Sequence, residues 1–141
     1  MRISVIAVGT RMPSWVSQGI TEYSKRLPRE LQLVWREIPL ARRGRAACAL
    51  QSCAVEGEQM LKAIRAGEHV IALDVAGQRL STQQLARQLE NWKMMGDNHS
   101  FLIGGPEGLS PDCLARADQR WSLSDLTLPH PLVRVLLVEQ L

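Results

Sequence analysis

Short apolar stretches recur along the chain, and each predicts a β-strand. Residues 2–8 are apolar at almost every position, a pattern typical of a strand that is covered on both faces of its sheet. Further strands are expected at 31–38, 69–74 and 99–103, with a last short one near Arg120–Leu123.

Apolar residues at helical spacing fill the intervals between these strands. Intervals of three and four predict a helix from Pro13 to about Leu27, and a longer helical stretch runs from about Ala46 to Ala66. Three more helices are expected: one after the capping-box signature that begins at Ser81, a short one after Ser110, and one over Leu132–Leu141.

Strands that alternate with helices predict an α/β fold with a mainly parallel sheet and helices on both faces. A chain of 141 residues is long enough for one ordinary core, so a single domain is expected over residues 1–141. Ligands of such sheets bind at the carboxyl ends of the strands, where the strand order reverses. The loops that could carry function are therefore Asp74–Gly77, Gly104–Ser110 and Ser124–Pro131.

The first candidate for chemistry is Gly104-Gly105-Pro106-Glu107-Gly108, directly after a buried strand. Its glycines allow the backbone to approach a ligand closely, although a plain tight turn has the same composition. Glu107 could hold a polar ligand group, accept a proton, or satisfy the amides of its own loop. No phosphate-binding lysine follows, so a triphosphate site is not supported.

The second candidate is the segment Leu123–Leu128, which is unusually apolar for a connecting loop. If this irregular backbone is buried, its amides and carbonyls need partners. A heteroaromatic ligand such as adenine could supply them, and protein contacts alone are the alternative. His130 lies beside this segment and could be catalytic, whereas His69 and His99 start strands and are interpreted as structural.

Charge is distributed unevenly along the chain. Residues 1–65 carry eleven Lys and Arg against five Asp and Glu, whereas residues 66–141 carry six against nine, and 14 of the 17 basic residues are arginine. Arginine grips phosphate bidentately, so the N-terminal half is expected to meet a polyanion, unless it is only a solvated basic face. Arg134 could bind RNA phosphate or pair with Glu139.

The remaining composition argues against several classes of protein. The three cysteines, Cys48, Cys53 and Cys113, lack the spacing of a zinc or redox site and are interpreted as reduced and structural, and no metal is expected. No secretory signal or apolar stretch of about 20 residues is present, so a cytoplasmic protein without a membrane span is expected.

Several longer motifs together resemble one known family. The segments LIGGPEGLSP at 102–111, WSLSDLTLPHPLVRVLLVEQL at 121–141, VGTRMPSWV at 8–16, EYSKRLP at 22–28 and EGEQML at 56–61 are similar to the ribosomal RNA pseudouridine N3-methyltransferases of the SPOUT superfamily. The resemblance covers essentially the whole chain.

This resemblance implies a C-terminal trefoil knot that holds S-adenosylmethionine, and a homodimer in which the partner subunit completes the active site. It implies as substrate a pseudouridine of 23S ribosomal RNA on the assembled ribosome, methylated at N3 in one step without a metal. Carried over by motif, the cofactor contacts would be Leu73, Gly104, Leu123, Ser124, Asp125, Leu126, Thr127 and Leu128.

The RNA contacts and the catalytic groups are less directly implied. Arg42, Arg43 and Arg45 are expected to bind RNA phosphates, with Arg134 as a further candidate. The resemblance places the catalytic side chains in a tail beyond the position of Leu141. A non-enzymatic ribosome-binding module with the same fold is the alternative, and an enzyme that uses another nucleotide in the same crevice is a second.

Overall fold

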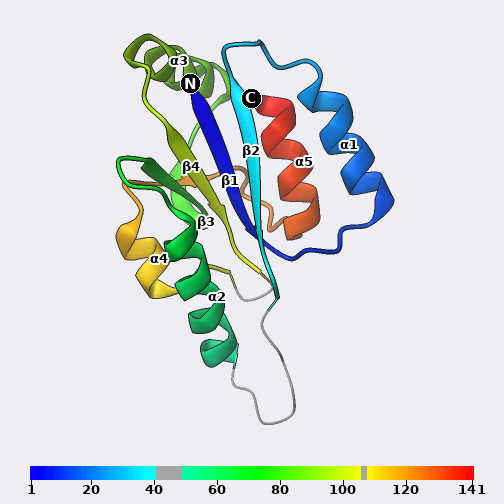
Figure 1. Cartoon of the computed structure of the whole chain (residues 1–141), viewed down its shortest axis with the longest axis vertical. Helices are drawn as coiled ribbons and strands as arrows, with labels where there is room; N and C mark the ends of the chain where they lie inside the picture. The colour runs from blue at the N-terminus through cyan, green and yellow to red at the C-terminus, as the bar shows by residue number, and fades with distance from the viewer. Residues whose placement is uncertain (41–48, 106–107) are drawn as a thin grey trace.

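The structure is a computed structural model that describes residues 1–40, 49–105 and 108–141. Five parallel strands form one sheet in the order β2-β1-β4-β3-β5 (Figure 1). The strands are β1 (Arg2–Val8), β2 (Gln32–Ile38), β3 (His69–Arg79), β4 (His99–Ile103) and β5 (Gln119–Ser122). This arrangement confirms the predicted parallel α/β fold.

Helices cover both faces of the sheet, as predicted. They are α1 (Ser14–Ser24), α2 (Ala49–Ala63), α3 (Thr82–Met95), α4 (Pro111–Arg116) and α5 (His130–Gln140). In Figure 1, α1 and α5 lie side by side, and the two helices pack against each other.

Alternation along β1 divides the core into two apolar clusters, because successive strand residues point to opposite faces. Ile3 and Val5 belong to a cluster that includes side chains of α3 and α5. Ile6 and Val8 belong to a second cluster, which includes Met60 of α2 and a residue of α4. The strand is therefore buried on both sides, which explains its nearly continuous apolar sequence.

Two helix starts follow the sequence signals closely. The Ser81 hydroxyl accepts a hydrogen bond from the backbone N–H of Gln84 at 3.1 Å, and the Gln84 side chain accepts one from the Ser81 N–H at 2.8 Å. Ser110 caps α4 by accepting from the Cys113 N–H at 3.2 Å, with Pro111 in the first turn. The predicted capping box and N-cap are confirmed.

The clearest departure from the sequence prediction is in β3. A loop was expected at Asp74–Gly77, but the strand continues to Arg79. Both Leu73 and Gln78 are aligned with Trp121 of β5, so the four residues between them form an irregularity within the β3–β5 ladder. A β-carbon on Gly77 would lie 2.7 Å from the backbone of Trp121, so only glycine fits this close approach.

The described residues also bear on the predictions about membrane spans and cysteines. Within the described ranges, no helix is both long enough and apolar enough to cross a membrane. Cys53 and Cys113 are buried, as expected of structural cysteines, whereas Cys48 lies outside the described residues. The same is true of Arg42, Arg43, Arg45 and Glu107.

Candidate functional site

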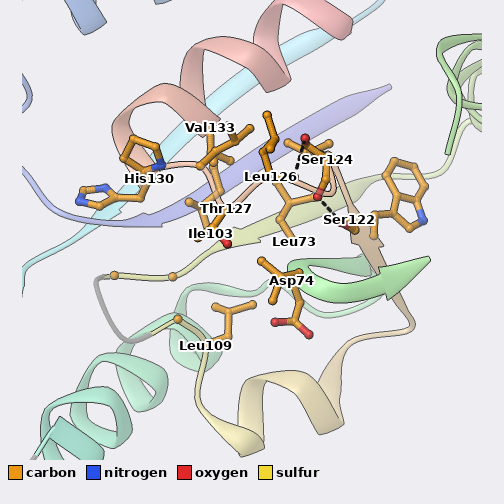
Figure 2. A pocket seen from close by; sticks show the side chains of 18 residues that line it. Leu73, Asp74, Ile103, Leu109, Ser122, Ser124, Leu126, Thr127, His130 and Val133 are labelled. Carbon is orange, nitrogen blue, oxygen red and sulfur yellow. Dashed lines mark hydrogen bonds between the residues drawn. The ribbon is translucent and has the colours of Figure 1, made fainter. Parts of the chain in front are cut away.

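A cavity of about 600 Å³ opens at the carboxyl ends of β3, β4 and β5 (Figure 2). The wall from β3 includes Leu73 and Asp74, and the segment after β4 contributes Gly104 and Gly105. The segment from β5 into α5 supplies much of the remaining lining. The cavity therefore lies at the edge of the sheet where ligands of parallel α/β folds bind.

The glycine loop after β4 folds back on itself beside the cavity. The Gly108 N–H donates to the Gly105 carbonyl at 2.9 Å, and Gly108 has a φ of +80°. A β-carbon on Gly104 would lie 2.5 Å from the carbonyl carbon of Gly108. Glycine at 104 thus permits a backbone contact that any side chain would prevent.

The segment after β5 presents backbone polar groups, and no charged side chain, to the cavity. The Ser122 hydroxyl donates to the Ser124 carbonyl at 2.9 Å, and the Leu126 N–H donates to the Ser124 hydroxyl at 3.0 Å. Among the described residues, positions 124–128 make no hydrogen bond from backbone to backbone. Several of their amides and carbonyls therefore remain available to a ligand or to water.

His130 and Asp74 are the titratable groups that line the cavity in the described part of the chain. The His130 Nδ1 is buried and has no hydrogen-bond partner among the described residues. Burial, followed by the nearby charge of Arg134, lowers the pKa of His130 below its ordinary value. The imidazole is therefore neutral at pH 7 and adds no positive charge to the cavity.

The structure brings together most of the residues expected to bind the cofactor. Asp125 is the exception, because its carboxylate points away to an exposed ion pair with Arg79 at 2.7 Å and does not line the cavity. The lining residues expected from the sequence are Leu73, Gly104, Leu123, Ser124, Leu126, Thr127 and Leu128.

Some lining residues were not in the predicted cofactor set. Ile103 and Val133 line the cavity from the end of β4 and from α5. Both belong to regular elements with an apolar pattern, so their sequence positions look like ordinary core positions. Asp74, by contrast, had a signal, because it lies in a loop predicted to be at the ligand-binding edge.

The side chain of Arg134 lies in a different place from the one expected. Its side chain is only 2% exposed and pairs with Glu37 at 2.8 Å, not with Glu139. It also donates to the Val8 carbonyl at 3.2 Å and to the Gly9 carbonyl at 2.7 Å. The structure therefore does not support an RNA contact for Arg134, because the guanidinium is enclosed between α5 and the ends of β1 and β2.

His69 and His99 lie at the amino ends of their strands, away from this cavity, in keeping with the structural role expected for them. The His69 Nε2 lies 3.1 Å from the Gln119 side-chain nitrogen, and the His99 ring stacks on Trp92 with centroids 3.7 Å apart. The described residues contain no group of three or more His, Cys, Asp or Glu side chains that could hold a metal ion.

An open parallel α/β sheet with a cavity at its carboxyl edge is the arrangement in which proteins of this fold class bind their ligands. The family described as "Predicted SPOUT methyltransferase" matches residues 1–141 of the chain. The chain therefore belongs to the SPOUT methyltransferase family, and the predicted C-terminal knot fits this family.

Individual relatives agree with this assignment. The chain is 54% identical over 141 residues to Ribosomal RNA large subunit methyltransferase H of Marinomonas sp. (strain MWYL1), covering 100% of this chain and 91% of the relative. It is 56% identical to the protein of the same name from Saccharophagus degradans, again covering 100% and 91%.

A solved structure from Neisseria gonorrhoeae, assigned to a methylase family, shares the fold. Its TM-score is 0.58 at 13% identity, with 98% of this chain and 80% of that one covered.

Proposed function

We propose that this methyltransferase transfers a methyl group from S-adenosylmethionine to N3 of a pseudouridine in 23S ribosomal RNA on the assembled ribosome. The observation that carries the proposal is the cavity at the carboxyl ends of β3, β4 and β5, framed by the glycine loop and residues 123–128. Relatives named as large-subunit ribosomal RNA methyltransferases support the choice of RNA substrate.

The dimensions and chemistry of the cavity suit S-adenosylmethionine. Its volume of about 600 Å³ lies within the range of roughly 300–1,000 Å³ that is usual for small-molecule sites. Leucines and backbone groups of 123–128 would hold the adenine, since a heteroaromatic ring needs apolar contact on its faces and hydrogen bonds at its edge. Asp74 offers a half-buried carboxylate to the cationic part of the molecule.

The cofactor, when bound, supplies an already activated methyl group, so the protein mainly provides position and a suitable electrostatic environment. The glycine loop and the 123–128 segment orient the ligand and exclude water from its buried side. Neutral His130 avoids placing a second cation beside a sulfonium. None of these tasks requires a metal ion or a covalent nucleophile.

A homodimer is part of the proposal. Val75 and Leu126 line the cavity, yet they are 68% and 72% exposed in the single chain. Apolar side chains that remain exposed at a ligand site are typical of a surface that another molecule covers. A second subunit seated there would complete the site, as the family resemblance implies.

The cofactor site is tested by calorimetric titration with S-adenosylhomocysteine. Thr127→Arg should weaken binding by at least about tenfold, because the new side chain occupies the cavity, and tenfold corresponds to about 1.4 kcal/mol. The matched control is Asp125→Arg, two residues away and outside the cavity, which should bind within about threefold of the parent protein. Equal affinity in both variants would contradict this placement of the cofactor.

The reaction is tested by transfer of tritiated methyl groups to ribosomes with and without the target pseudouridine. Two proteins are compared: this chain, and a version extended by the C-terminal residues of its relatives. Transfer only to pseudouridylated ribosomes supports the proposal. If neither protein transfers methyl groups although both bind ribosomes, the non-enzymatic ribosome-binding function is correct instead.

A further inference from the structure

Part of the sheet carries arginines where a core would normally lie. The side chains of Leu33 and Trp35 on β2 pack into the apolar cluster on one face. Alternation therefore directs Gln32, Val34 and Arg36 to the other face.

On that other face, Gln32 is exposed and Val34 is only half-buried, so this region is partly open to solvent. Arg2 of β1 is in register with Gln32, and Ile6 is in register with Arg36. This face therefore carries Arg2 and Arg36 beside the exposed Gln32.

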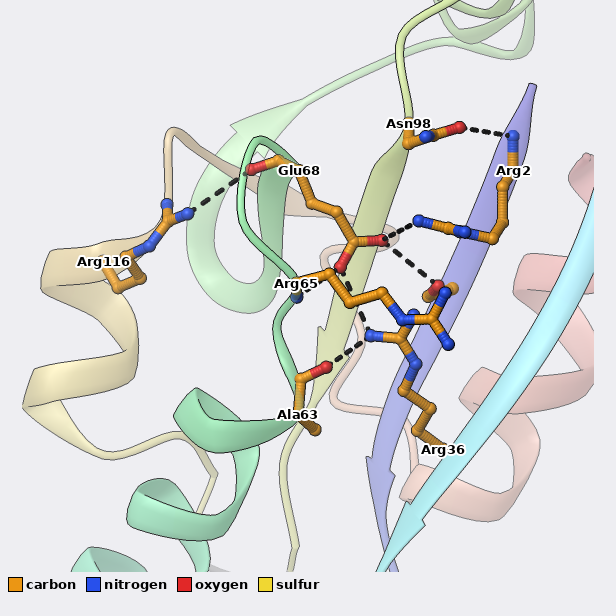
Figure 3. A network of polar contacts seen from close by, with 8 residues as sticks. Arg2, Arg36, Ala63, Arg65, Glu68, Asn98 and Arg116 are labelled. Carbon is orange, nitrogen blue, oxygen red and sulfur yellow. Dashed lines mark hydrogen bonds and ion pairs between the residues drawn. The ribbon is translucent and has the colours of Figure 1, made fainter.

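The buried carboxylate of Glu68 lies between Arg2 and Arg36 and forms ion pairs with both (Figure 3). The side chain of Glu68 is 1% exposed, and its oxygens lie 3.3 Å from Arg36 Nη1 and 3.8 Å from Arg2 Nη2. The Arg65 backbone N–H donates to Glu68 Oε1 at 2.7 Å, which fixes the residue that carries a third guanidinium. Figure 3 shows the Arg65 side chain pointing toward Arg36.

One carboxylate does not neutralise three guanidinium groups. Burial raises the pKa of Glu68, but the backbone hydrogen bond from Arg65 and the charge of Arg36 lower it by more. The pKa is therefore below its ordinary value, and Glu68 is ionised at pH 7. Two positive charges remain in excess among these four residues. Arg65 is an exposed residue, and its guanidinium forms no hydrogen bond or ion pair with another described side chain.

We infer that Arg2, Gln32, Val34, Arg36 and Arg65 form a docking surface for the phosphate backbone of RNA, which we call the basic sheet face. The exposed Arg65 suits this partner because the planar fork of arginine binds phosphate oxygens bidentately. The side chains of Arg2 and Arg36 are 25% and 15% exposed, so they contribute positive charge from partly buried positions. The surface lies toward the amino ends of β1 and β2, whereas the cofactor cavity lies at the carboxyl ends of β3, β4 and β5. RNA that contacts it is therefore separate from the nucleotide that is methylated.

The choice of RNA among polyanions rests on the proposed function, but the test does not depend on methyl transfer. Arg65→Glu combined with Gln32→Glu makes the charge of the exposed part of the surface negative. It removes no partner of Glu68, since Arg65 donates to Glu68 through its backbone N–H. The matched control is Arg87→Glu with Gln83→Glu, the same substitutions at exposed positions of α3. Both double variants change the net charge equally.

Binding to assembled ribosomes is measured by cosedimentation at several salt concentrations, and S-adenosylhomocysteine affinity verifies that each variant is folded. The surface variant should bind ribosomes about tenfold more weakly than the control. The slope of log K against log salt concentration should be smaller by about one, which corresponds to the loss of one phosphate contact. Equal binding and equal salt dependence in the two variants would overturn the inference. Absence of methyl transfer by the parent protein would instead count against the proposed function and leave this result standing.

Discussion

Replacing Arg134 by methionine tests whether this residue stabilises the fold or contacts RNA. Methionine keeps an unbranched apolar stem but removes the donors that reach the carbonyls of Val8 and Gly9 and the carboxylate of Glu37. A buried acceptor left without its donor costs roughly 1–3 kcal/mol. The ion pair contributes less, because Glu37 is 38% exposed and exposed pairs contribute under about 1 kcal/mol.

The sum, offset in part by the packing of the methionine side chain, gives an expected loss of about 3 kcal/mol in the free energy of unfolding. For a chain of 141 residues this corresponds to a fall of about 10 °C in Tm. Urea unfolding followed by fluorescence of the buried Trp92 and Trp121 measures it, at one fixed protein concentration. Glu37→Gln is the control and should lose less than about 1 kcal/mol.

Two outcomes would refute this reasoning. A loss within about 1 kcal/mol for Arg134→Met would show that the guanidinium does not hold α5 against the sheet. Weaker ribosome binding at unchanged stability would restore the RNA contact that the sequence suggested. Either result would place the side chain of Arg134 outside the enclosed position described above.

Two further changes test other parts of the structure. Burial, followed by the charge of His69, lowers the pKa of His99, so its stabilising effect is complete above the ordinary pKa near 6.5 and is lost as the pH falls below it. His99→Phe should therefore make the loss of unfolding free energy between pH 7 and pH 5 shallower than in the parent protein, and an unchanged slope would argue against a buried neutral imidazole. Gly104→Ala should weaken S-adenosylhomocysteine binding by about tenfold or more in calorimetry, because its β-carbon meets the Gly108 backbone. Gly67→Ala, at a glycine with positive φ but open space around it, should cost about 1 kcal/mol of stability and leave binding unchanged, so equal effects on binding would contradict this explanation.

The secondary structure was largely predictable, because apolar spacing and caps are local signals. β1 and the capping box of α3 follow such signals directly. The extension of β3 beyond Asp74 does not, because it depends on whether β5 offers a partner. The close approach of Gly77 to Trp121 joins positions far apart in the sequence, and nothing near residue 77 indicates it.

The cavity was predictable for a similar reason, since the glycine loop and the apolar segment after β5 are both recognisable in the sequence. Two side-chain positions were not. Asp125 turns outward to Arg79, and Arg134 turns inward to a carboxylate 97 residues earlier in the chain. Sequence proximity suggested Glu139 as the partner of Arg134, whereas the fold brings Glu37 closer.

The position of Arg134 also bears on when this chain can fold during its synthesis. β1 pairs with β4, which follows it by more than ninety residues. The carbonyl of Gly9 accepts its hydrogen bond from Arg134, 125 residues later in the chain. The ribosome makes α5 only after all five strands of the sheet. The early strands therefore leave the ribosome long before their partners exist, and folding should be slow and largely post-translational, as is usual when native contacts join distant parts of a chain.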